Sequence, residues 1–227
     1  MQSIYIVLLP GLDGTGLLFK PLIEKLPAYL KPIVVDYPTN EKLAYNALLA
    51  LVINALPKNE PFILLGESFS GPLSIMIAAT KPQGLKAIVL STSFIACPQR
   101  MIPKWADLLV FTTPFRASSF FAKIRALFGA YYSDELKQAL SLVKPEVLAY
   151  RLREIIKVNV ETELAACSLP ILYMQGKYDF MVPSSNLVKI KKIKPDVQYV
   201  QLKTSHMLLQ AKPNEAANSI CSFIEAL

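Results

Sequence analysis

Short apolar segments alternate with segments of helical periodicity along most of the chain, and this alternation restricts the possible folds more than any other feature. The short segments are rich in β-branched residues, and most are apolar throughout, as expected of parallel strands that are covered on both faces. We predict strands over Ser3–Leu9, Pro32–Asp36, Pro61–Gly66, Leu85–Ser91, Pro170–Gly176 and Val197–Leu202.

Apolar residues recur at helical spacing between these predicted strands. We predict helices over Leu17–Leu30, Glu41–Leu56, Phe69–Lys81, Ser184–Ile193 and Pro213–Ala226. Strands and helices in this order form a doubly wound, mostly parallel sheet with right-handed crossovers. The predicted fold class is therefore α/β, with a core made of residues 1–92 and 170–227, and a binding crevice is expected at the carboxyl ends of the strands.

The alternation is interrupted between residues 93 and 169. This segment has a helical pattern that Pro103 and Pro114 divide, and it interleaves aromatic with basic residues. We interpret it as a helical cap inserted into the core. The aromatic side chains pack either onto the sheet or against a substrate pocket, and the sequence leaves both arrangements open. Trp105 is the aromatic residue of this segment that we expect to contact substrate.

Composition excludes several classes of protein. Hydrophobic residues make up 53% of the chain and charged residues 18%, which excludes an intrinsically disordered chain. The longest apolar stretch, Ala44–Leu56, is too short to span a membrane, and the first ten residues lack the basic start of a signal peptide. Three cysteines without CxxC spacing predict neither disulfides nor a zinc site. We expect a cytoplasmic protein without stable membrane insertion.

The chain is basic: 24 lysine and arginine residues against 17 acidic ones give a formal net charge of +7. This balance favours acidic partners, such as phosphates, an acidic acyl carrier protein or anionic lipid headgroups. No nucleic-acid-binding motif accompanies the charge, so we expect no nucleic-acid partner.

Glycine is scarce, and six of the eight glycines lie in three loops that each follow a predicted strand. Loops at the same end of a parallel sheet converge, and glycine allows their backbones to turn sharply or approach one another closely. The six are Gly11, Gly14, Gly16, Gly66, Gly71 and Gly176. The spacing of the first three matches neither common nucleotide-binding pattern, so we expect no bound nucleotide.

Ser68 is the candidate nucleophile. It lies in the segment Gly66-Glu67-Ser68-Phe69-Ser70-Gly71, directly after one predicted strand and before a predicted helix. A serine on such a strand-to-helix turn exposes its hydroxyl at the helix N-terminus. The alternative is an ordinary helix-capping serine.

A serine hydroxyl needs a base, and the chain contains a single histidine, His206. It follows the last predicted strand, again at a carboxyl end, which is where a base would be needed. The imidazole in turn needs a carboxylate, and Asp179 follows the strand Pro170–Gly176, although an aspartate there also suits a simple turn. The order Ser68, Asp179, His206 is that of the hydrolase elbow.

The loop after the first predicted strand is the expected source of an oxyanion hole. We assign the backbone amides of Leu12 and Phe69 as its donors. Gly11, Phe180 and Met207 lie next to these candidate residues, and we expect them to contact substrate together with Trp105.

These residues resemble the alpha/beta-hydrolase superfamily over nearly the whole chain. The segments PGLDGTG and GESFSG are also similar to acyltransferases related to the plant phytyl ester synthases. The resemblance implies a triad of Ser68, His206 and Asp179, an acyl-enzyme intermediate and no cofactor. The chain departs from the superfamily pattern GxSxG because Ser70 stands in place of the last glycine, and it lacks the leading antiparallel strands of larger members, which indicates a minimal version of the fold.

We therefore expect a serine esterase that cleaves carboxylic esters with an apolar acyl group. A thioesterase or an acyltransferase would use the same triad, and comparing esters with thioesters of the same chain length would distinguish them. A hydrolase-like protein that binds ligands without turnover is a further alternative, and labelling of Ser68 by a fluorophosphonate would exclude it.

Overall fold

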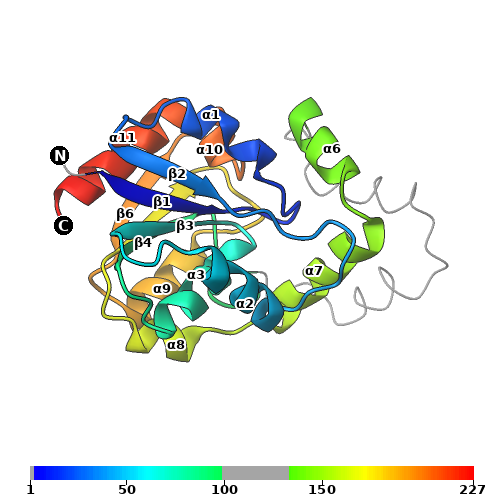
Figure 1. Ribbon diagram of the computed structural model, residues 1–227, viewed down its shortest axis with the longest axis horizontal. Coiled ribbons are helices and arrows are strands. Elements are labelled where there is room, and N and C mark those ends of the chain that lie inside the picture. The colour runs from blue at the N-terminus through cyan, green and yellow to red at the C-terminus, as the bar shows by residue number, and fades with distance from the viewer. Residues whose placement is uncertain (1–2, 99–132) are drawn as a thin grey trace.

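The computed structural model describes residues 3–98 and 133–227, which are drawn in colour in Figure 1. The predicted cap, residues 93–169, is thus described only at its two ends. Trp105 lies outside the described residues, and so do Pro103 and Pro114.

Six strands form one sheet, in which every neighbouring pair is parallel. The order across the sheet is β2-β1-β3-β4-β5-β6. The strands are β1 (Ile4–Leu9), β2 (Leu30–Val34), β3 (Phe62–Glu67), β4 (Leu85–Ser91), β5 (Ile171–Gly176) and β6 (Gln198–Leu202). Each predicted strand overlaps one of these, with ends that differ by at most two residues, so the predicted α/β class with a parallel sheet is confirmed.

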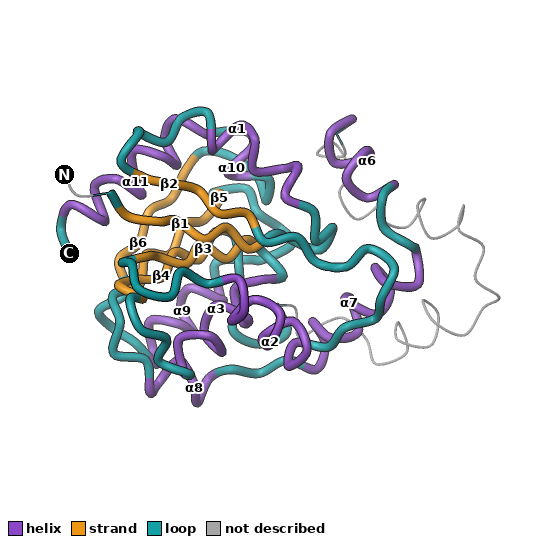
Figure 2. Tube along the Cα trace, in the orientation of Figure 1, coloured by secondary structure: helices purple, strands orange, loops and turns teal. Residues whose placement is uncertain are grey.

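Helices cover both faces of the sheet (Figures 1 and 2). On one face lie the short helix α1 (Lys20–Ile23), α10 (Leu208–Ala211) and α11 (Pro213–Glu225), which contact one another. On the other face lie α2 (Tyr45–Ala55), α3 (Ser70–Ala79), α8 (Glu161–Ala166) and α9 (Ser185–Ile193). A 3₁₀ turn over Gly16–Phe19 precedes α1. The remaining described helices are α6 (Asp134–Ser141) and α7 (Pro145–Lys157).

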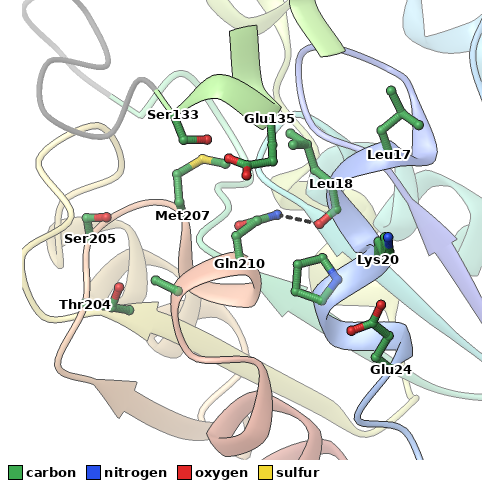
Figure 3. A pocket seen from close by; sticks show the side chains of 12 residues that line it. Leu17, Leu18, Lys20, Glu24, Ser133, Glu135, Thr204, Ser205, Met207 and Gln210 are labelled. Carbon is green, nitrogen blue, oxygen red and sulfur yellow. Dashed lines mark hydrogen bonds between the residues drawn. The ribbon is translucent and has the colours of Figure 1, made fainter. Parts of the chain in front are cut away.

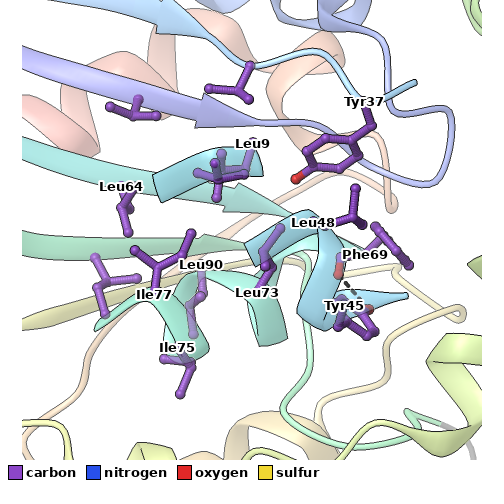
Figure 4. Close-up of a cluster of buried hydrophobic side chains, with 14 of the residues drawn as sticks. Leu9, Tyr37, Tyr45, Leu48, Leu64, Phe69, Leu73, Ile75, Ile77 and Leu90 are labelled. Atoms are coloured by element: carbon purple, nitrogen blue, oxygen red, sulfur yellow. Dashed lines mark hydrogen bonds between the residues drawn. The ribbon is translucent and has the colours of Figure 1, made fainter. Parts of the chain in front are cut away.

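Alternate residues of each central strand face opposite layers, so the sheet separates two apolar cores. In β1, for example, Ile6 and Leu8 pack in the core beneath α11, whereas Val7 and Leu9 pack in the core beneath α3. The strand is therefore apolar throughout, which is why it has no alternating pattern in the sequence. The core beneath α3 extends to Tyr45, whose ring stacks on Phe69 at 4.7 Å between ring centroids (Figure 4).

The predicted helix over Leu17–Leu30 is wrong in its extent. The α-helix ends at Ile23, and β2 already begins at Leu30. Pro27 explains the difference, because it has no amide hydrogen to continue the helix and disfavours helical backbone in the residue before it. The amide of Leu26 instead closes a tight turn on the carbonyl of Ile23.

The carboxyl ends of the strands meet at one edge of the sheet. Leu9 pairs with Gly66, Gly66 with Leu90, and Gly176 with Leu202, so the loops that follow these strands begin side by side. The helices α6 and α7 lie beyond this edge (Figure 1). All the residues singled out by the sequence within the described ranges lie in or next to these loops.

Candidate active site

Ser68 occupies a strained turn between β3 and α3. Its φ angle is 46°, in the left-handed region that side chains other than glycine rarely adopt. Hydrogen bonds hold the backbone there, because the Ser68 amide donates to the Ser91 carbonyl at 2.9 Å and the Ser68 carbonyl accepts from the Ser93 hydroxyl at 2.5 Å. Such a turn raises the side chain out of the sheet, and strained backbone of this kind is concentrated at functional sites.

The departure of Ser70 from the superfamily pattern is accommodated without loss of the turn. The Ser70 hydroxyl donates to the carbonyl of Pro10 and accepts from the Tyr37 hydroxyl, at 2.7 Å for the latter pair. The close approach comes one residue later, at Gly71, where a Cβ would collide with the side chain of Ser93. Ser70 therefore ties the turn to the loop after β1, and Gly71 provides the space.

The structure brings Ser68, His206 and Asp179 together. His206 Nε2 lies 2.8 Å from Ser68 Oγ, and His206 Nδ1 lies 2.9 Å from Asp179 Oδ2. Because an ionised carboxylate only accepts hydrogen bonds, Nδ1 carries the proton of the neutral ring and Nε2 is left to accept from the serine. The imidazole and the carboxylate are both buried, so the hydrogen bond between them is shielded from water, whereas Ser68 is only partly buried.

Asp179 is held by backbone donors. Its second oxygen, Oδ1, accepts from the amides of Met181 and Val182, both at 2.9 Å. The His206 loop approaches the Asp179 loop closely at Gly176, where a Cβ would come within 2.7 Å of the Thr204 carbonyl oxygen. Both loops are therefore fixed by contacts outside the three side chains.

The two predicted oxyanion donors flank the candidate nucleophile. Phe69 follows Ser68 at the start of α3, and Leu12 lies in the loop after β1, where Gly11 approaches Ser68. No described residue accepts a hydrogen bond from the amide of Leu12 or Phe69. Both amides are thus available to a substrate oxygen, as an oxyanion hole requires.

Arg151 fixes the loop that carries Leu12, and sequence reasoning missed it. Its guanidinium donates from Nη1 to the carbonyls of Leu12 (3.0 Å) and Asp13 (2.7 Å), and from Nη2 to the carbonyl of Pro38 (3.0 Å). The side chain projects from α7 and is 2% exposed. Nothing in its local sequence indicates this role, since Leu12 lies 139 positions away.

Two cavities adjoin the candidate triad. A small one of about 60 Å³ contains Ser68 and His206, and apolar residues of α6 and α7 line it together with Gly11 and Met207. A larger one of about 660 Å³ lies between α1 and α10 (Figure 3). Of the predicted substrate contacts, Gly11 and Met207 therefore lie at the site, whereas Phe180 lines neither cavity and is 53% exposed.

Glu67 is a second residue that sequence reasoning missed, although it stands inside the Ser68 motif. Its carboxyl group is buried in the small cavity and accepts a hydrogen bond from Gln210 Nε2 at 2.9 Å. Its pKa is raised from 4.5 to about 7, mainly by burial; the hydrogen bond from Gln210 opposes the shift, Asp13 adds to it, and His206 opposes it. Glu67 therefore holds its proton into the neutral range, which limits negative charge beside Ser68.

Replacing Glu67 with glutamine should change how stability depends on pH. In the wild type the unfolded chain ionises this carboxyl near pH 4.5, while the folded protein retains the proton to about pH 7. The folded state thus binds more protons over this interval, and the free energy of unfolding falls as the pH rises. Glu67→Gln removes this loss, which amounts to about 3 kcal/mol above pH 7.

Urea unfolding at pH 5 and pH 8 measures this difference. From pH 5 to pH 8, we expect the free energy of unfolding of Glu67→Gln to rise relative to that of the wild type. The exposed Glu41 supplies the control, since Glu41→Gln should leave the difference near zero. Equal behaviour of the two variants would contradict the role given to Glu67.

The described ranges, 3–98 and 133–227, contain neither a candidate membrane span nor a candidate metal site. No helix in these ranges is long and apolar enough to cross a membrane. No group of three or more histidine, cysteine, aspartate or glutamate residues in these ranges is placed to hold a metal ion.

No protein-family model matches the chain. It is 25% identical over 216 residues to a pimeloyl-acyl-carrier-protein methyl ester esterase of Xanthomonas oryzae pv. oryzae, and this match covers 85% of the chain and 83% of the relative. It is 29% identical over 126 residues to phytyl ester synthase 1, chloroplastic, of Arabidopsis thaliana. That second match covers 50% of the chain but only 18% of the relative.

Among solved structures, the esterase EaEST from Exiguobacterium antarcticum superposes with a TM-score of 0.84 at 16% identity, covering 99% of this chain and 92% of that one. A lipase-esterase related protein from Clostridium acetobutylicum gives a TM-score of 0.80 at 14% identity, covering 98% and 95%. At these identities the likeness establishes the fold. The chain has the alpha/beta-hydrolase fold, and its predicted resemblance to that superfamily is confirmed.

Proposed function

We propose that this chain, which has the alpha/beta-hydrolase fold, is a serine hydrolase that cleaves carboxylic esters through an acyl-enzyme intermediate on Ser68. The observation that carries the proposal is the unbroken chain of hydrogen bonds from Ser68 through His206 to Asp179. The names of two kinds of neighbour, the methyl ester esterase relative and the esterase structures, support the coarser statement that the activity is hydrolysis of an ester.

Each residue of the site has a role in this reaction. Ser68 Oγ attacks the acyl carbonyl while His206 Nε2 accepts its proton, and the developing imidazolium is stabilised by Asp179. The amides of Leu12 and Phe69 donate to the oxyanion of the tetrahedral intermediate. His206 then gives the proton to the leaving oxygen, and in the second half of the reaction it activates a water that releases the acid.

The small cavity beside Ser68 is the candidate acyl site. Apolar side chains of α6 and α7 face it, namely Leu136, Leu140, Leu152 and Ile155. Its volume of about 60 Å³ is far below the 660 Å³ of the neighbouring cavity. The site therefore favours an acyl group that is apolar and short.

Acyl transfer is the second candidate function, and the relative named as a phytyl ester synthase is the observation that favours it. The same acyl-enzyme would then pass its acyl group to an alcohol in place of water. An acyl-thioester substrate, including one carried by an acidic acyl carrier protein, would use the same residues, and the net charge of +7 suits such a partner.

A series of acyl esters and thioesters tests the proposal. We expect kcat/KM for p-nitrophenyl acetate and butyrate to exceed that for the dodecanoate by at least about tenfold, because the long chain cannot enter the small cavity without displacing its walls. Butyryl esters should also exceed butyryl thioesters. A preference for the thioester would establish the alternative substrate class, and faster product formation with added alcohol than with water alone would establish acyl transfer.

A fluorophosphonate probe provides an independent measurement. The probe should attach to Ser68 alone, as read from the mass of the peptide that contains it. Ser70 serves as an internal control in the same peptide, because its hydroxyl is buried and hydrogen-bonded to Tyr37. A protein that takes up no probe and turns over no ester would be a binding protein and not an enzyme.

A further inference from the structure

The cavity of about 660 Å³ is far larger than the one that contains Ser68. Its lining comes from the 3₁₀ turn and α1, from α10 and the segment that leads into it, and from the start of α6, where Ser133 and Glu135 lie (Figure 3). Leu17, Leu18, Pro21, Met207 and Ala211 are its apolar lining residues. Its charged lining residues are exposed at its rim. A cavity of this size and character is typical of a binding site for a small organic molecule.

The two cavities adjoin each other. Leu18 and Met207 line both, and Gln210 of the large cavity donates a hydrogen bond to Glu67 of the small one. The Gln210 amide is itself anchored by a second hydrogen bond, to the Leu18 carbonyl at 3.2 Å, which Figure 3 shows as a dashed line. Leu18, Met207 and Gln210 thus form the wall between the two cavities.

The large cavity lies on the histidine side of the reacting atoms. Ser205 and Met207, the residues directly before and after His206, both line it. Gly11, Leu12, Ser68 and the His206 ring itself line only the small cavity. The small cavity therefore holds the reacting groups, and the large cavity begins beside the two residues that flank His206.

The chemistry of ester cleavage assigns a part of the substrate to each cavity. His206 Nε2 must pass its proton to the leaving oxygen, so this oxygen comes within hydrogen-bond distance of Nε2. A group attached to the leaving oxygen that is too large for the small cavity would extend past His206 toward Ser205 and Met207, which border the large cavity. The acyl group, bonded to the carbon under attack, remains beside Ser68 in the small one.

We propose that the large cavity binds the alcohol portion of the ester, and that the natural leaving group is a bulky, mostly apolar alcohol. This assignment rests on the proposed esterase function. It differs from what the name of the methyl ester esterase relative indicates, because the alcohol released from a methyl ester is methanol, which is small. A methyl group would leave the walls formed by Leu17, Pro21 and Ala211 without contact.

Variants of two exposed lining residues test the assignment without touching the reacting groups. Leu17 is 48% exposed and Ala211 is also exposed, so Leu17→Ala and Ala211→Trp preserve the core. We expect each to lower kcat/KM for 2-phenylethyl acetate by about fivefold or more, the first by losing contact and the second by filling space. Methyl acetate should change less than about twofold. Val188→Ala, at a site on α9 that is 69% exposed, is the matched control.

Two series of substrates decide between the alcohol and the acyl group as occupant. One series holds the acetyl group constant and enlarges the alcohol, and the other holds methanol constant and lengthens the acyl chain. The proposal requires the Leu17 and Ala211 variants to alter the first series alone. Selective effects on the second series would overturn it, as would equal effects of all three variants.

A binding measurement separates this assignment from the proposed activity. In the Ser68→Ala protein, 2-phenylethanol should shift the Met207 methyl resonance, assigned through Met207→Leu, and Ala211→Trp should weaken that binding. If wild-type protein turns over no ester but still binds the alcohol in this way, the esterase proposal fails and the binding site stands. Absence of any shift at saturating 2-phenylethanol would overturn the site itself.

Discussion

Replacing Ser68 with alanine is expected to lower kcat for ester hydrolysis by at least about 10⁴-fold while the protein remains folded. The size of the loss follows from the chemistry, because without Oγ no acyl-enzyme forms and only the residual contribution of the oxyanion hole and binding remains. Stability should change by less than about 1 kcal/mol, since alanine meets the same backbone strain at a φ of 46° and Ser68 Oγ makes its hydrogen bond to His206 alone among the described residues.

The steady-state rate with p-nitrophenyl butyrate and the midpoint of urea unfolding measure the two parts of this prediction. Ser74→Ala is the matched control, because it removes another buried hydroxyl from the same helix, one that donates to the Ser70 carbonyl at 2.9 Å. It should retain at least about a third of the activity. A Ser68→Ala protein that kept more than about 1% of wild-type kcat would refute Ser68 as the nucleophile.

Replacing Arg151 with methionine is expected to destabilise the protein by about 3–5 kcal/mol. Burial lowers the pKa of this guanidinium, and the charge of Asp13 opposes that effect, yet the group still donates to three carbonyls, of which those of Leu12 and Asp13 are buried. Methionine fills much of the space but supplies no donor, so the carbonyls of Leu12, Asp13 and Pro38 lose their partners and Asp13 loses a neighbouring positive charge. The free energy of urea unfolding measures this effect.

The same substitution should lower kcat by about 10- to 100-fold, with a much smaller effect on KM. Arg151 acts through the loop that carries the Leu12 amide, so its loss weakens binding of the oxyanion more than binding of the substrate. Lys157→Met removes a cation from the same helix, where the ion pair with Glu154 is 3.6 Å long and the lysine is exposed. That control should cost less than about 1 kcal/mol and leave kcat unchanged. Equal kcat values for the two variants would exclude a positioning role for Arg151.

The sheet could be predicted from the sequence because its strands are short, apolar and buried on both faces. The ends of Leu85–Ser91 coincide with those of β4, and the other predicted strands differ from the observed ones by one or two residues. The predicted helix over Leu17–Leu30 is too long, because apolar residues continue at helical spacing after Ile23, where the α-helix ends ahead of Pro27. The short helix α10 was not predicted, since four residues carry too little periodicity to be recognised.

The placement of Ser68, Asp179 and His206 could be predicted because each follows a strand of a parallel sheet, and the carboxyl ends of such strands meet. Arg151 could not, because its role depends on how α7 packs against a loop that is 138 positions away. Glu67 was visible in the motif, but its burial and its raised pKa arise from Gln210 and the surrounding core and not from its neighbours in the chain. A local sequence pattern does not show which distant segments of the chain come into contact in the fold.

The hydrogen bonds from Arg151 to Leu12 and Asp13 also limit how the protein could be re-engineered. Grafting a different connection between β4 and β5 is an obvious way to alter substrate preference. Such a chimera would lack α7, and the loop after β1 would lose the hydrogen bonds that Arg151 donates to it. The segment between β4 and β5 therefore cannot be exchanged independently of that loop. A replacement segment must therefore place a cationic side chain where the Arg151 guanidinium lies, beside the carbonyls of Leu12 and Asp13.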